Sequence, residues 1–600
     1  MKISKIKIEN WRSIKLIEID FQDLMIFIGQ NNCGKSNILY ALLFFFGQIK
    51  PSDLDFNGDS QDFFVELTFT NLDENDKRQF RKYLNADQSI VVRKTASREG
   101  GSSYHGYVQT PEIDWLKEEN IANFSTREAS SILPLNIFLP PTGRITRELF
   151  KNAQEDYIEA NKDAIEFHYR LELGQFLGLK SVAQGIFGEI YFIPAIKSAS
   201  DELNVKGNAL FNQLYGSVIQ KLSQHNLQYR VAKEQVTTLV KSLNKLNEAG
   251  AENTARPTEI SSLENRLQSE LTNWNTKIEI EITPPDIDEV FRIGTSIWVD
   301  DGIKTDISRK GHGLQRAMIF ALIKSYSQIL KEERENEENE NDIDGEEFRR
   351  RSSKSTFFIL EEPELYLHPQ AQRELFSSLR ELSKSNNQII IATHSSFFAD
   401  LDLYNSICII RKNDLENGTK KIQCNNDLFL DLDDRQQFNL TYWINPDRAE
   451  LFFAKKVILL EGPTDKTVIP YLAKNLDCFR FEYTLIDCGS KDSIPIYIAL
   501  LNKFQIPYTV VYDRDHQAHK NPDAIASANR SSQILNSKID FEIGKEVIFE
   551  NDIEEEIGLT EQNNKSKPYI AIKHISDPEY VIPERLKHKI RQIYDAIEVL

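Results

Sequence analysis

The sequence lacks the segments that mark exported and membrane-spanning proteins. Its 600 residues begin MKISKIKIENWRSI, without an apolar stretch of signal-peptide type, and no later run approaches the roughly 20 apolar residues that span a bilayer. Cysteine is scarce, and no CxxC pair occurs, so neither a zinc site nor a disulfide framework is indicated. We therefore expect a cytoplasmic protein without a membrane partner, with reduced thiols at Cys33, Cys408, Cys424, Cys478 and Cys488.

A surplus of basic residues is also absent. Lys and Arg total 72 against 91 Asp and Glu, a formal net charge of −19. This balance argues against a protein that coats nucleic acid uniformly, but it leaves a local basic groove open. Hydrophobic residues at 40% and charged residues at 27% are typical of a soluble globular protein. Because one hydrophobic core seldom grows beyond about 250 to 300 residues, the length predicts several domains.

Strand-like runs that alternate with helical patterns predict an α/β fold. Residues 1–199 contain the runs KISKIKI, LMIFIG, FFVELTF and EIYFIP, with one helical pattern after a glycine-rich loop. Residues 200–275 have helical spacing and a turn at EAGAENTARPT, consistent either with a packed helical hairpin or with a protruding dimerisation arm. The first domain resumes over 276–445, where the charged run 331–351 reads as a solvated or disordered insertion. Residues 446–600 predict a second α/β domain.

The strongest local pattern is GQNNCGKS, residues 29–36. It fits G-x-x-x-x-G-K-[ST] between an apolar strand and the helical NILYALLFFF. In such a loop glycines let backbone amides close around phosphates, the lysine reaches the outer phosphates and the last hydroxyl reaches Mg²⁺. The pattern predicts an ATP site with contacts from Gly29, Asn32, Gly34, Lys35 and Ser36.

A second motif, TFFILEEPELYLHP, is acidic and places two carboxylates at the end of an apolar strand. The first, Glu361, is expected to hold Mg²⁺, and the second, Glu362, to act as general base on the attacking water. A simple charge pair at a strand end is the alternative. The proline turn and the helical continuation after Pro363 favour the catalytic interpretation.

Together these motifs resemble the ABC/SMC/RecF-like ATPases, whose paired heads enclose ATP. Asn10 to Ser13 resembles that family's N-F-R-s element, which implies that Arg12 approaches the nucleotide phosphates. Residues 308–315, SRKGHGLQ, resemble a divergent signature motif that departs from LSGGQ. IIIATHSS resembles the switch strand, which implies that His394 senses the γ-phosphate.

The resemblance also implies that a second subunit completes each ATP site. The signature-like residues Ser308, Gly313 and Gln315 would contact ATP on that partner, so we expect at least a homodimer. Taken singly, His394 would more often be a structural histidine, and residues 311–315 a plain helix cap.

A second group of carboxylates follows in the C-terminal domain. KVILLEGPTDK delivers Glu461 into a glycine turn, with Asp465 one helical turn later, and IPYTVVYDRDH places Asp513 and Asp515 at the end of another apolar strand. Alternation along a strand sends the last two carboxylates to the same side. Hard carboxylate ligands without His or Cys suit Mg²⁺ or Mn²⁺, which support phosphodiester hydrolysis.

This second pattern resembles the Toprim domain of topoisomerases, primases and nucleases. An ATPase head followed by Toprim in one chain resembles the overcoming-lysogenization-defect (OLD) family, which includes the nuclease subunit of Gabija defence systems. That family has a further acidic residue and a lysine, for which FENDIEEEIG offers Glu554 or Glu555, with Glu554 our choice as metal ligand, and NNKSKPYIA offers Lys567 as a catalytic residue. Solvated surface positions are the alternative for all three.

We therefore expect an ATP-regulated, Mg²⁺- or Mn²⁺-dependent DNA endonuclease, with a role in prokaryotic defence and a partner protein implied by the resemblance. One rival is a RecF/SMC-like DNA-repair ATPase, a clamp or a loader, whose Toprim domain binds DNA without cleaving it. The intact Glu461, Asp513 and Asp515 count against that rival. A primase would need a zinc motif, and a topoisomerase would need a tyrosine nucleophile with DNA-gate domains.

Overall fold

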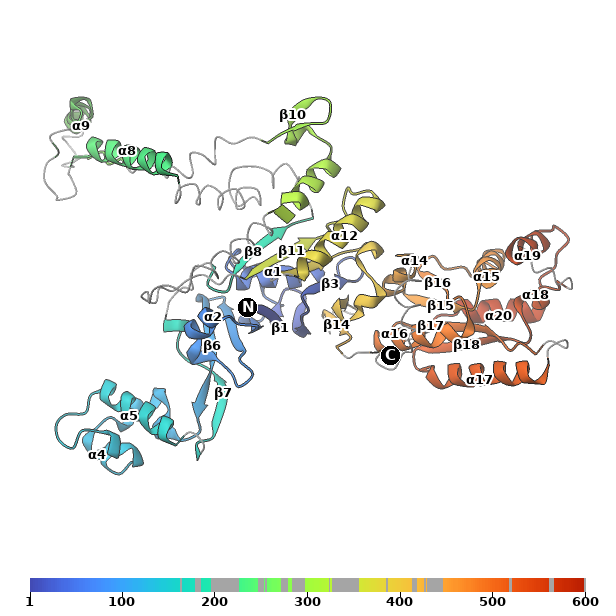
Figure 1. The fold of residues 1–600 in the computed structure, drawn as a ribbon, viewed down its shortest axis with the longest axis horizontal. Helices are drawn as coiled ribbons and strands as arrows, with labels where there is room; N and C mark the ends of the chain where they lie inside the picture. The colour runs from blue at the N-terminus through green and yellow to red at the C-terminus, as the bar shows by residue number, and fades with distance from the viewer. Residues whose placement is uncertain are drawn as a thin grey trace. The chain divides into compact units, whose positions relative to one another are not determined.

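A computed structural model gives the fold of the chain (Figure 1). It describes residues 1–161, 164–178, 185–195, 226–245, 253, 256–270, 279–282, 297–322, 324–325, 355–384, 387–412, 418–425, 428, 446–516, 521–559 and 566–597. The predicted insertion at 331–351 lies outside these residues.

The chain divides into two compact units. The first comprises Met1–Tyr191, Glu347–Glu364 and Gln372–Leu600, and the second comprises Phe192–Glu346 with Leu365–Ala371. The first unit therefore contains the glycine-rich loop together with the C-terminal α/β domain. The boundaries expected at 199, 275 and 445 stay predictions.

An antiparallel sheet opens the first unit. Its strand order is β2-β1-β4-β5-β6-β7, and every neighbouring pair is antiparallel. In β4 and β5 buried and half-buried residues alternate, the period of two expected when one sheet face covers a core. The bounds are β1 Lys2–Trp11, β2 Ile14–Asp20, β4 Asp62–Thr70, β5 Ile90–Ser97, β6 Gly101–Pro111 and β7 Phe167–Leu171, with helix α2 at Glu74–Gln79.

A second sheet carries the glycine-rich loop. Its order is β14-β13-β3-β12-β11-β8; β13, β3, β12 and β11 are parallel, and β14 is antiparallel to β13. Every residue of β3 and β12 is buried, as in central parallel strands covered on both faces. The bounds are β3 Leu24–Ile28, α1 Lys35–Phe45, β8 Glu189–Ile193, β11 Thr356–Glu361, α12 Pro369–Ser383, β12 Asn387–Ala392, β13 Ile407–Arg411 and β14 Lys420–Gln423.

The C-terminal domain is a four-stranded parallel sheet of order β16-β15-β17-β18, which confirms the predicted second α/β domain. Figure 1 shows α15 and α17 on opposite sides of this sheet. Apolar residues of α15, α19 and α20 form a core with β15, β17 and β18. The bounds are α14 Pro446–Ala449, β15 Lys456–Leu460, α15 Pro463–Asn475, β16 Tyr483–Asp487, α16 Ile494–Lys503, β17 Tyr508–Asp513, α17 Pro522–Lys538, β18 Gly544–Phe549, α18 Ile553–Glu556, α19 Lys567–Ile575 and α20 Glu584–Tyr594.

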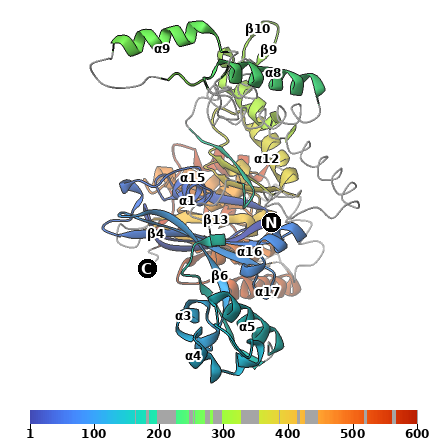
Figure 2. The same ribbon diagram turned by 90° about the vertical axis from the view of Figure 1, so that its left-hand side faces the viewer.

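Between β6 and β7 the chain forms a small helical cluster, which corrects the interpretation of residues 1–199 as strands with one strong helix. Figure 2 shows α3 Ile121–Phe124, α4 Arg127–Ser131 and α5 Arg147–Ala160 gathered at the end of β6. The helices α3 and α4 are too short to give a clear helical period in the sequence. The buried core of the cluster is Leu135, Leu139, Ile145, Phe150 and Ala153.

The second unit contains helices where helical spacing predicts them. These are α8 Leu227–Leu243 and α9 Thr258–Glu270, and the predicted turn contributes contacts between them. Asn253 from this turn donates to the Lys241 carbonyl, while Arg256 donates to the Leu243 carbonyl and pairs with Glu264. The choice between a packed hairpin and a dimerisation arm stays open. The unit also holds β9 Trp298–Asp300 and β10 Lys304–Asp306, and residues 312–322 are helical.

No helix in the described part of the chain is long and apolar enough to cross a membrane. All five cysteines are free, in agreement with the expectation of thiols.

Candidate active sites

The glycine-rich loop joins β3 to α1 and forms one wall of a cavity of about 290 Å³. Residues 31–37 line it together with Glu361, Glu362, Ala392 and His394. Gly29 and Gly34 have φ of 149° and 110°, and a Cβ at Gly29 would collide with the Ile410 carbonyl oxygen. Only glycine fits there without strain. The loop brings the predicted Asn32, Lys35 and Ser36 to one cavity with the acidic pair.

Lys35 is a buried residue that lines this cavity. Its Nζ donates to the carbonyls of Gly29 and Gln30, each at 3.0 Å, and lies 2.8 Å from Nε2 of His394. Burial lowers the pKa of Lys35. Burial also lowers the pKa of His394, and the Lys35 charge lowers it further. A neutral imidazole beside a lysine is suited to contact a phosphate oxygen as a hydrogen-bond donor.

The acidic pair lies at the carboxyl end of β11, beside the switch histidine. The Glu362 main-chain N–H donates to Ala392, and Oε1 of Glu362 lies 3.7 Å from Nε2 of His394. Glu362 has a φ of 44°, which turns the chain sharply at this point. Glu361 and Glu362 both line the cavity, so the two predicted carboxylates and His394 converge.

Glu364 also belongs to this site, although the sequence motifs did not identify it. Its Oε1 accepts the His394 main-chain N–H at 2.7 Å, and burial raises the pKa of its carboxyl group. Its Oε2 is buried without a protein partner. Its place in EEPE, two residues after Glu362, was the available signal. Glu364 therefore fixes the main chain that carries His394.

Arg12 is not among the residues that line this cavity. Its Nε donates to Asp55 at 2.8 Å, its guanidinium lies over the Tyr40 ring, and its Nη1 lies 3.4 Å from Oδ1 of Asn37. Asn37 does line the cavity, so Arg12 is one side chain away from it. Its predicted contact with nucleotide phosphates stays a prediction.

The signature-like segment belongs to the second unit. Gln315 is buried, and its Nε2 donates to the carbonyls of Ile307 and Lys310. Ser308 is held by Asp306 through a 2.6 Å hydrogen bond, and a Cβ at Gly313 would lie 3.3 Å from the Tyr366 carbonyl oxygen. Within one chain, Gln315 thus stabilises the preceding turn, as the helix-cap alternative expects. Contact with a partner's ATP stays a prediction.

A cluster of carboxylates lies at the carboxyl edge of the C-terminal sheet. Since β15 and β17 are adjacent and parallel, their ends bring Glu461 and Asp513 together, and Oε2 of Glu461 accepts the Asp513 main-chain N–H at 3.3 Å. Asp465, in the first turn of α15, accepts the Gly462 N–H through Oδ2. We call Glu461, Asp465, Asp513 and Asp515 the carboxylate cluster.

Asp515 corrects one step of the sequence argument. The strand β17 ends at Asp513, and Asp515 follows it with a φ of 64°, so strand alternation does not place the two carboxylates on one side. The two charges nevertheless lie close enough for the Asp515 carboxylate to contribute to the raised pKa of Asp513. Burial is the largest cause of the raised pKa of Asp513, and likewise of Asp465, followed by the charges of neighbouring carboxylates.

Glu554 and Lys567, which were assigned through the family resemblance, lie beside the carboxylate cluster. Lys567 Nζ is 3.4 Å from Oε1 of Glu554, and the Glu554 charge contributes to the raised pKa of Asp465. Glu555 instead accepts from Asn551 at 2.6 Å. The geometry therefore brings Glu554, rather than Glu555, toward the cluster, together with Lys567.

Lys491 is a further cation at the carboxylate cluster, and the sequence motifs predicted no role for it. It follows β16 in a short turn, only 6% of the residue is exposed, and its Nζ donates to the Asp513 main-chain carbonyl. It lies between two motifs in the sequence, in GSKDS, where neither periodicity nor spacing indicates a contact with β17. The crossover from β16 past β15 brings it there.

The cluster has the chemistry of a divalent-cation site. Oδ1 of Asp465 and Oδ1 of Asp513 are buried without a protein hydrogen bond, an arrangement that is costly for carboxylates unless a cation pairs with them. Within the described residues no three His, Cys, Asp or Glu side chains stand in coordinating positions. The oxygen donors fit Mg²⁺ or Mn²⁺, and side-chain rotation would complete the coordination.

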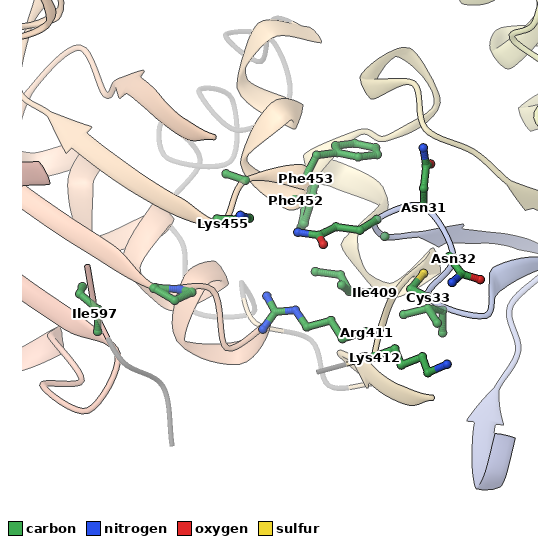
Figure 3. Close-up of a pocket in the computed structure, with 15 residues that line it drawn as sticks. Asn31, Asn32, Cys33, Ile409, Arg411, Lys412, Phe452, Phe453, Lys455 and Ile597 are labelled. Atoms are coloured by element: carbon green, nitrogen blue, oxygen red, sulfur yellow. The ribbon is translucent and has the colours of Figure 1, made fainter. Parts of the chain in front are cut away.

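A second cavity, of about 550 Å³, shares Asn31, Asn32 and Cys33 with the nucleotide cavity (Figure 3). Figure 3 shows Arg411, at the end of β13, reaching into it. Arg411 Nη1 donates to the Gln505 carbonyl, three residues before β17 begins. The glycine-rich loop and the strand that ends at Asp513 are thus connected through a few residues.

Two family models match the chain. One, described as an AAA ATPase domain, matches residues 1–399, and the other, described as the TOPRIM domain of overcoming-lysogenization-defect-like proteins, matches residues 452–515. The residues of both candidate sites lie inside the matched ranges, except Glu554 and Lys567.

Three curated relatives are similar to most or part of the chain. The Old nuclease of Escherichia phage P2 is 22% identical over 86% of this chain and 77% of its own length. The OLD nuclease of Thermus scotoductus is 30% identical over 37% of this chain and 44% of its own, and the endonuclease GajA of Bacillus cereus is 25% identical over 27% of each.

Among solved structures, an SMC head bound to the C-winged helix domain of ScpA covers 70% of this chain and 97% of its own. It is 13% identical, and its TM-score of 0.32 is too low to support an inference. The family models and the relatives cover the ATPase region and the C-terminal domain in the order that the sequence predicts. The chain therefore belongs to the AAA ATPase domain family through residues 1–399 and carries a TOPRIM domain like that of overcoming-lysogenization-defect proteins, and it is an ATPase and an endonuclease.

Proposed function

We propose that the chain is a DNA endonuclease that uses Mg²⁺ or Mn²⁺ at the carboxylate cluster and is controlled by ATP at the glycine-rich loop. One observation carries the proposal. Buried, unpartnered carboxylate oxygens of Asp465 and Asp513 lie at the edge where Glu461 also ends its strand. Such oxygens favour a divalent cation at this edge of the sheet.

At the carboxylate cluster, Glu461 and Asp513 would hold the cations, with Asp465, Asp515 and Glu554 as further ligands. Bound divalent ions supply positive charge to the attacking and leaving oxygens of the phosphodiester. Lys567, 3.4 Å from Glu554, would stabilise the charge that develops on the scissile phosphate. No tyrosine nucleophile is required.

At the nucleotide cavity, Lys35 would leave its loop carbonyls for the outer phosphates, and Ser36 and Glu361 would hold the ion that accompanies ATP. Glu362 would orient and deprotonate the attacking water, while His394, fixed by Glu364, would contact the γ-phosphate. Arg12 would approach the phosphates from its place beside Asn37, whereas the predicted contacts of the signature-like residues with a partner's ATP require a homodimer.

The connection through Arg411 supports the proposed control by nucleotide. Gly29 lies against the main chain of Ile410, and the next residue donates to Gln505 before β17. A change in the loop on ATP binding would reach the strand that carries Asp513. Coupling of this kind requires that ATP bind active and inactive arrangements with different affinity.

DNA as substrate, a defence role against foreign DNA and a partner protein complete the proposal. They rest on the likeness to proteins named Old nuclease, OLD nuclease and endonuclease GajA. The rival function, a Toprim module that binds DNA without cleaving it, predicts a different result in the same experiment.

The deciding experiment is cleavage of supercoiled plasmid with Mg²⁺ or Mn²⁺, with and without ATP, by wild type, Asp513→Ala and Lys35→Ala. We expect cleavage by wild type, loss of cleavage in Asp513→Ala, and an altered response to ATP in Lys35→Ala. Equal cleavage by wild type and Asp513→Ala would contradict the assigned site. DNA binding without cleavage under every condition would favour the rival.

A further inference from the structure

Lys491 ties the loop after β16 to the end of β17, across the end of β15. The strand order β16-β15-β17 places Glu461, after β15, between the two. Asp513 is consequently held at both main-chain polar groups: its N–H donates to Glu461 at 3.3 Å, and its carbonyl accepts from Lys491. The position of the Asp513 carboxylate therefore depends on the Lys491 side chain.

The turn that carries Lys491 is itself held in place. The neighbouring Asp492 accepts a 2.8 Å hydrogen bond from Ser531 of α17, and the Lys491 ammonium lies 5.0 Å from the centre of the Tyr512 ring. A lysine with 6% exposure in such a frame has little freedom to leave it. Lys491 is thus a fixed group rather than a surface side chain.

The ammonium lies near the carboxylates without binding one. The charges of Glu461, Asp515 and Asp513 all act on it, yet in the described part of the chain no carboxylate oxygen lies within 4.0 Å of its Nζ. Its hydrogen bond goes to the Asp513 main-chain carbonyl instead, so Oδ1 of the Asp513 carboxylate, buried without a hydrogen bond, stays available to a cation. Outer groups that orient metal ligands in this way contribute about 10–100-fold to metal affinity or activity.

We propose that Lys491 is a positioning residue of the nuclease site, which holds the end of β17 through the Asp513 carbonyl so that the Asp513 carboxylate is oriented for the divalent cation. The inference rests on the proposed function, because it requires a cation at the carboxylate cluster. It assigns Lys491 no contact with substrate.

Lys456 provides a matched control at the opposite edge of the same sheet. It is 1% exposed, and its Nζ donates to the main-chain carbonyls of Ile593 and Asp595. It begins β15, whereas Glu461 follows the end of that strand. Lys456→Met therefore removes an equally buried lysine, also bonded to carbonyls, from the domain without touching the cluster.

The experiment is calorimetric titration of Mn²⁺ into the full chain for wild type, Asp513→Ala, Lys491→Met, Lys491→Gln, Lys491→Arg and Lys456→Met, with thermal unfolding of each. The binding that Asp513→Ala removes defines the nuclease site. We expect Lys491→Met and Lys491→Gln, which lose the ammonium and its reach, to weaken this binding about 10-fold or more. Lys491→Arg, which can still donate to the carbonyl, should restore most of it.

Lys456→Met should not weaken Mn²⁺ binding, whichever way it shifts the melting temperature. Unchanged or tighter Mn²⁺ binding in Lys491→Met, or in Lys491→Gln if the first variant does not fold, would overturn the inference. Equal weakening by Lys456→Met would also overturn it, since the effect would then be one of general stability. If wild type shows no binding that Asp513→Ala removes, the metal site of the proposed function itself is wrong.

Discussion

The nucleotide cavity and the carboxylate cluster lie at the same kind of place, the carboxyl edge of a parallel sheet, but they are built differently. The nucleotide cavity takes most of its lining from one continuous segment, residues 31–37, whose conformation glycines permit. The carboxylate cluster draws its groups from several elements: Glu461 follows β15, Asp465 lies in α15, and Asp513 and Asp515 lie at and just after the end of β17. Lys491, beside the cluster, follows β16. A binding loop can thus be local, while a metal cluster depends on how strands are ordered.

This difference decides how each site responds to substitution. The loop depends on backbone conformation, so a methyl group at a glycine disturbs it. The cluster depends on charge balance, so a change of one carboxylate or one cation disturbs it. Both sites place a buried lysine on main-chain carbonyls, Lys35 and Lys491, and Lys35 also lines a cavity.

The largest expected effect separates the two chemistries. Asp513→Asn should reduce DNA cleavage by well over about 100-fold, since even outer-shell changes at metal sites cost 10–100-fold, and should leave ATP hydrolysis intact. Glu362→Gln should reduce ATP hydrolysis by about 10²–10⁴-fold through loss of the general base. Both activities are measured for both variants. Loss of both activities in Asp513→Asn would show that the two sites are not chemically separate.

The next effect tests the backbone dependence of the loop. Gly29→Ala should weaken ATP binding roughly 5- to 150-fold, because the new Cβ would collide with the Ile410 carbonyl, and overpacking of this kind costs about 1–3 kcal/mol. Gly58→Ala is the control: Gly58 also has a positive φ, of 53°, but nothing lies within 4 Å of the added Cβ. Fluorescent-nucleotide binding measures both. Normal binding by Gly29→Ala would contradict the described loop geometry.

The smallest effect on either activity is expected from Lys456, a buried lysine away from both sites, which should influence stability instead. Burial lowers the pKa of Lys456 to about 7, against about 10.4 for lysine in an unfolded chain. Between these values the unfolded chain binds a proton that the folded chain does not, so stability should rise with pH from about 7 to about 10, by up to about 1.4 kcal/mol per unit. Lys456→Met should remove this slope. Denaturant unfolding at several pH values measures it, and equal slopes in both proteins would refute the assignment.

The sequence predicts the local parts of this molecule well. GQNNCGKS and the strands that end near Glu361 and Glu461 have their expected neighbours, because each motif carries its own strand, turn and helix signals. Parallel order along the chain then brings Glu461 and Asp513 to one edge, as a second α/β domain implies.

The parts that sequence could not give depend on long-range placement or on short elements. Lys491 reaches Asp513 only through the order of three strands, and Glu364 reaches His394 only because β11 and β12 are neighbours. Asp515 lies past the end of its strand, so alternation misplaced it. In the helical cluster between β6 and β7, α3 and α4 are too short to show a helical period beside strong strand signals.

The position of bound Mn²⁺ tests the central claim most directly. Crystals of the protein grown with Mn²⁺ and a non-hydrolysable ATP analogue would show the ion by its anomalous scattering. We predict that one Mn²⁺ ion lies among Glu461, Asp465 and Asp513, and that another lies beside Ser36 and Glu361. Manganese bound elsewhere, with both of these positions unoccupied at saturating Mn²⁺, would contradict it.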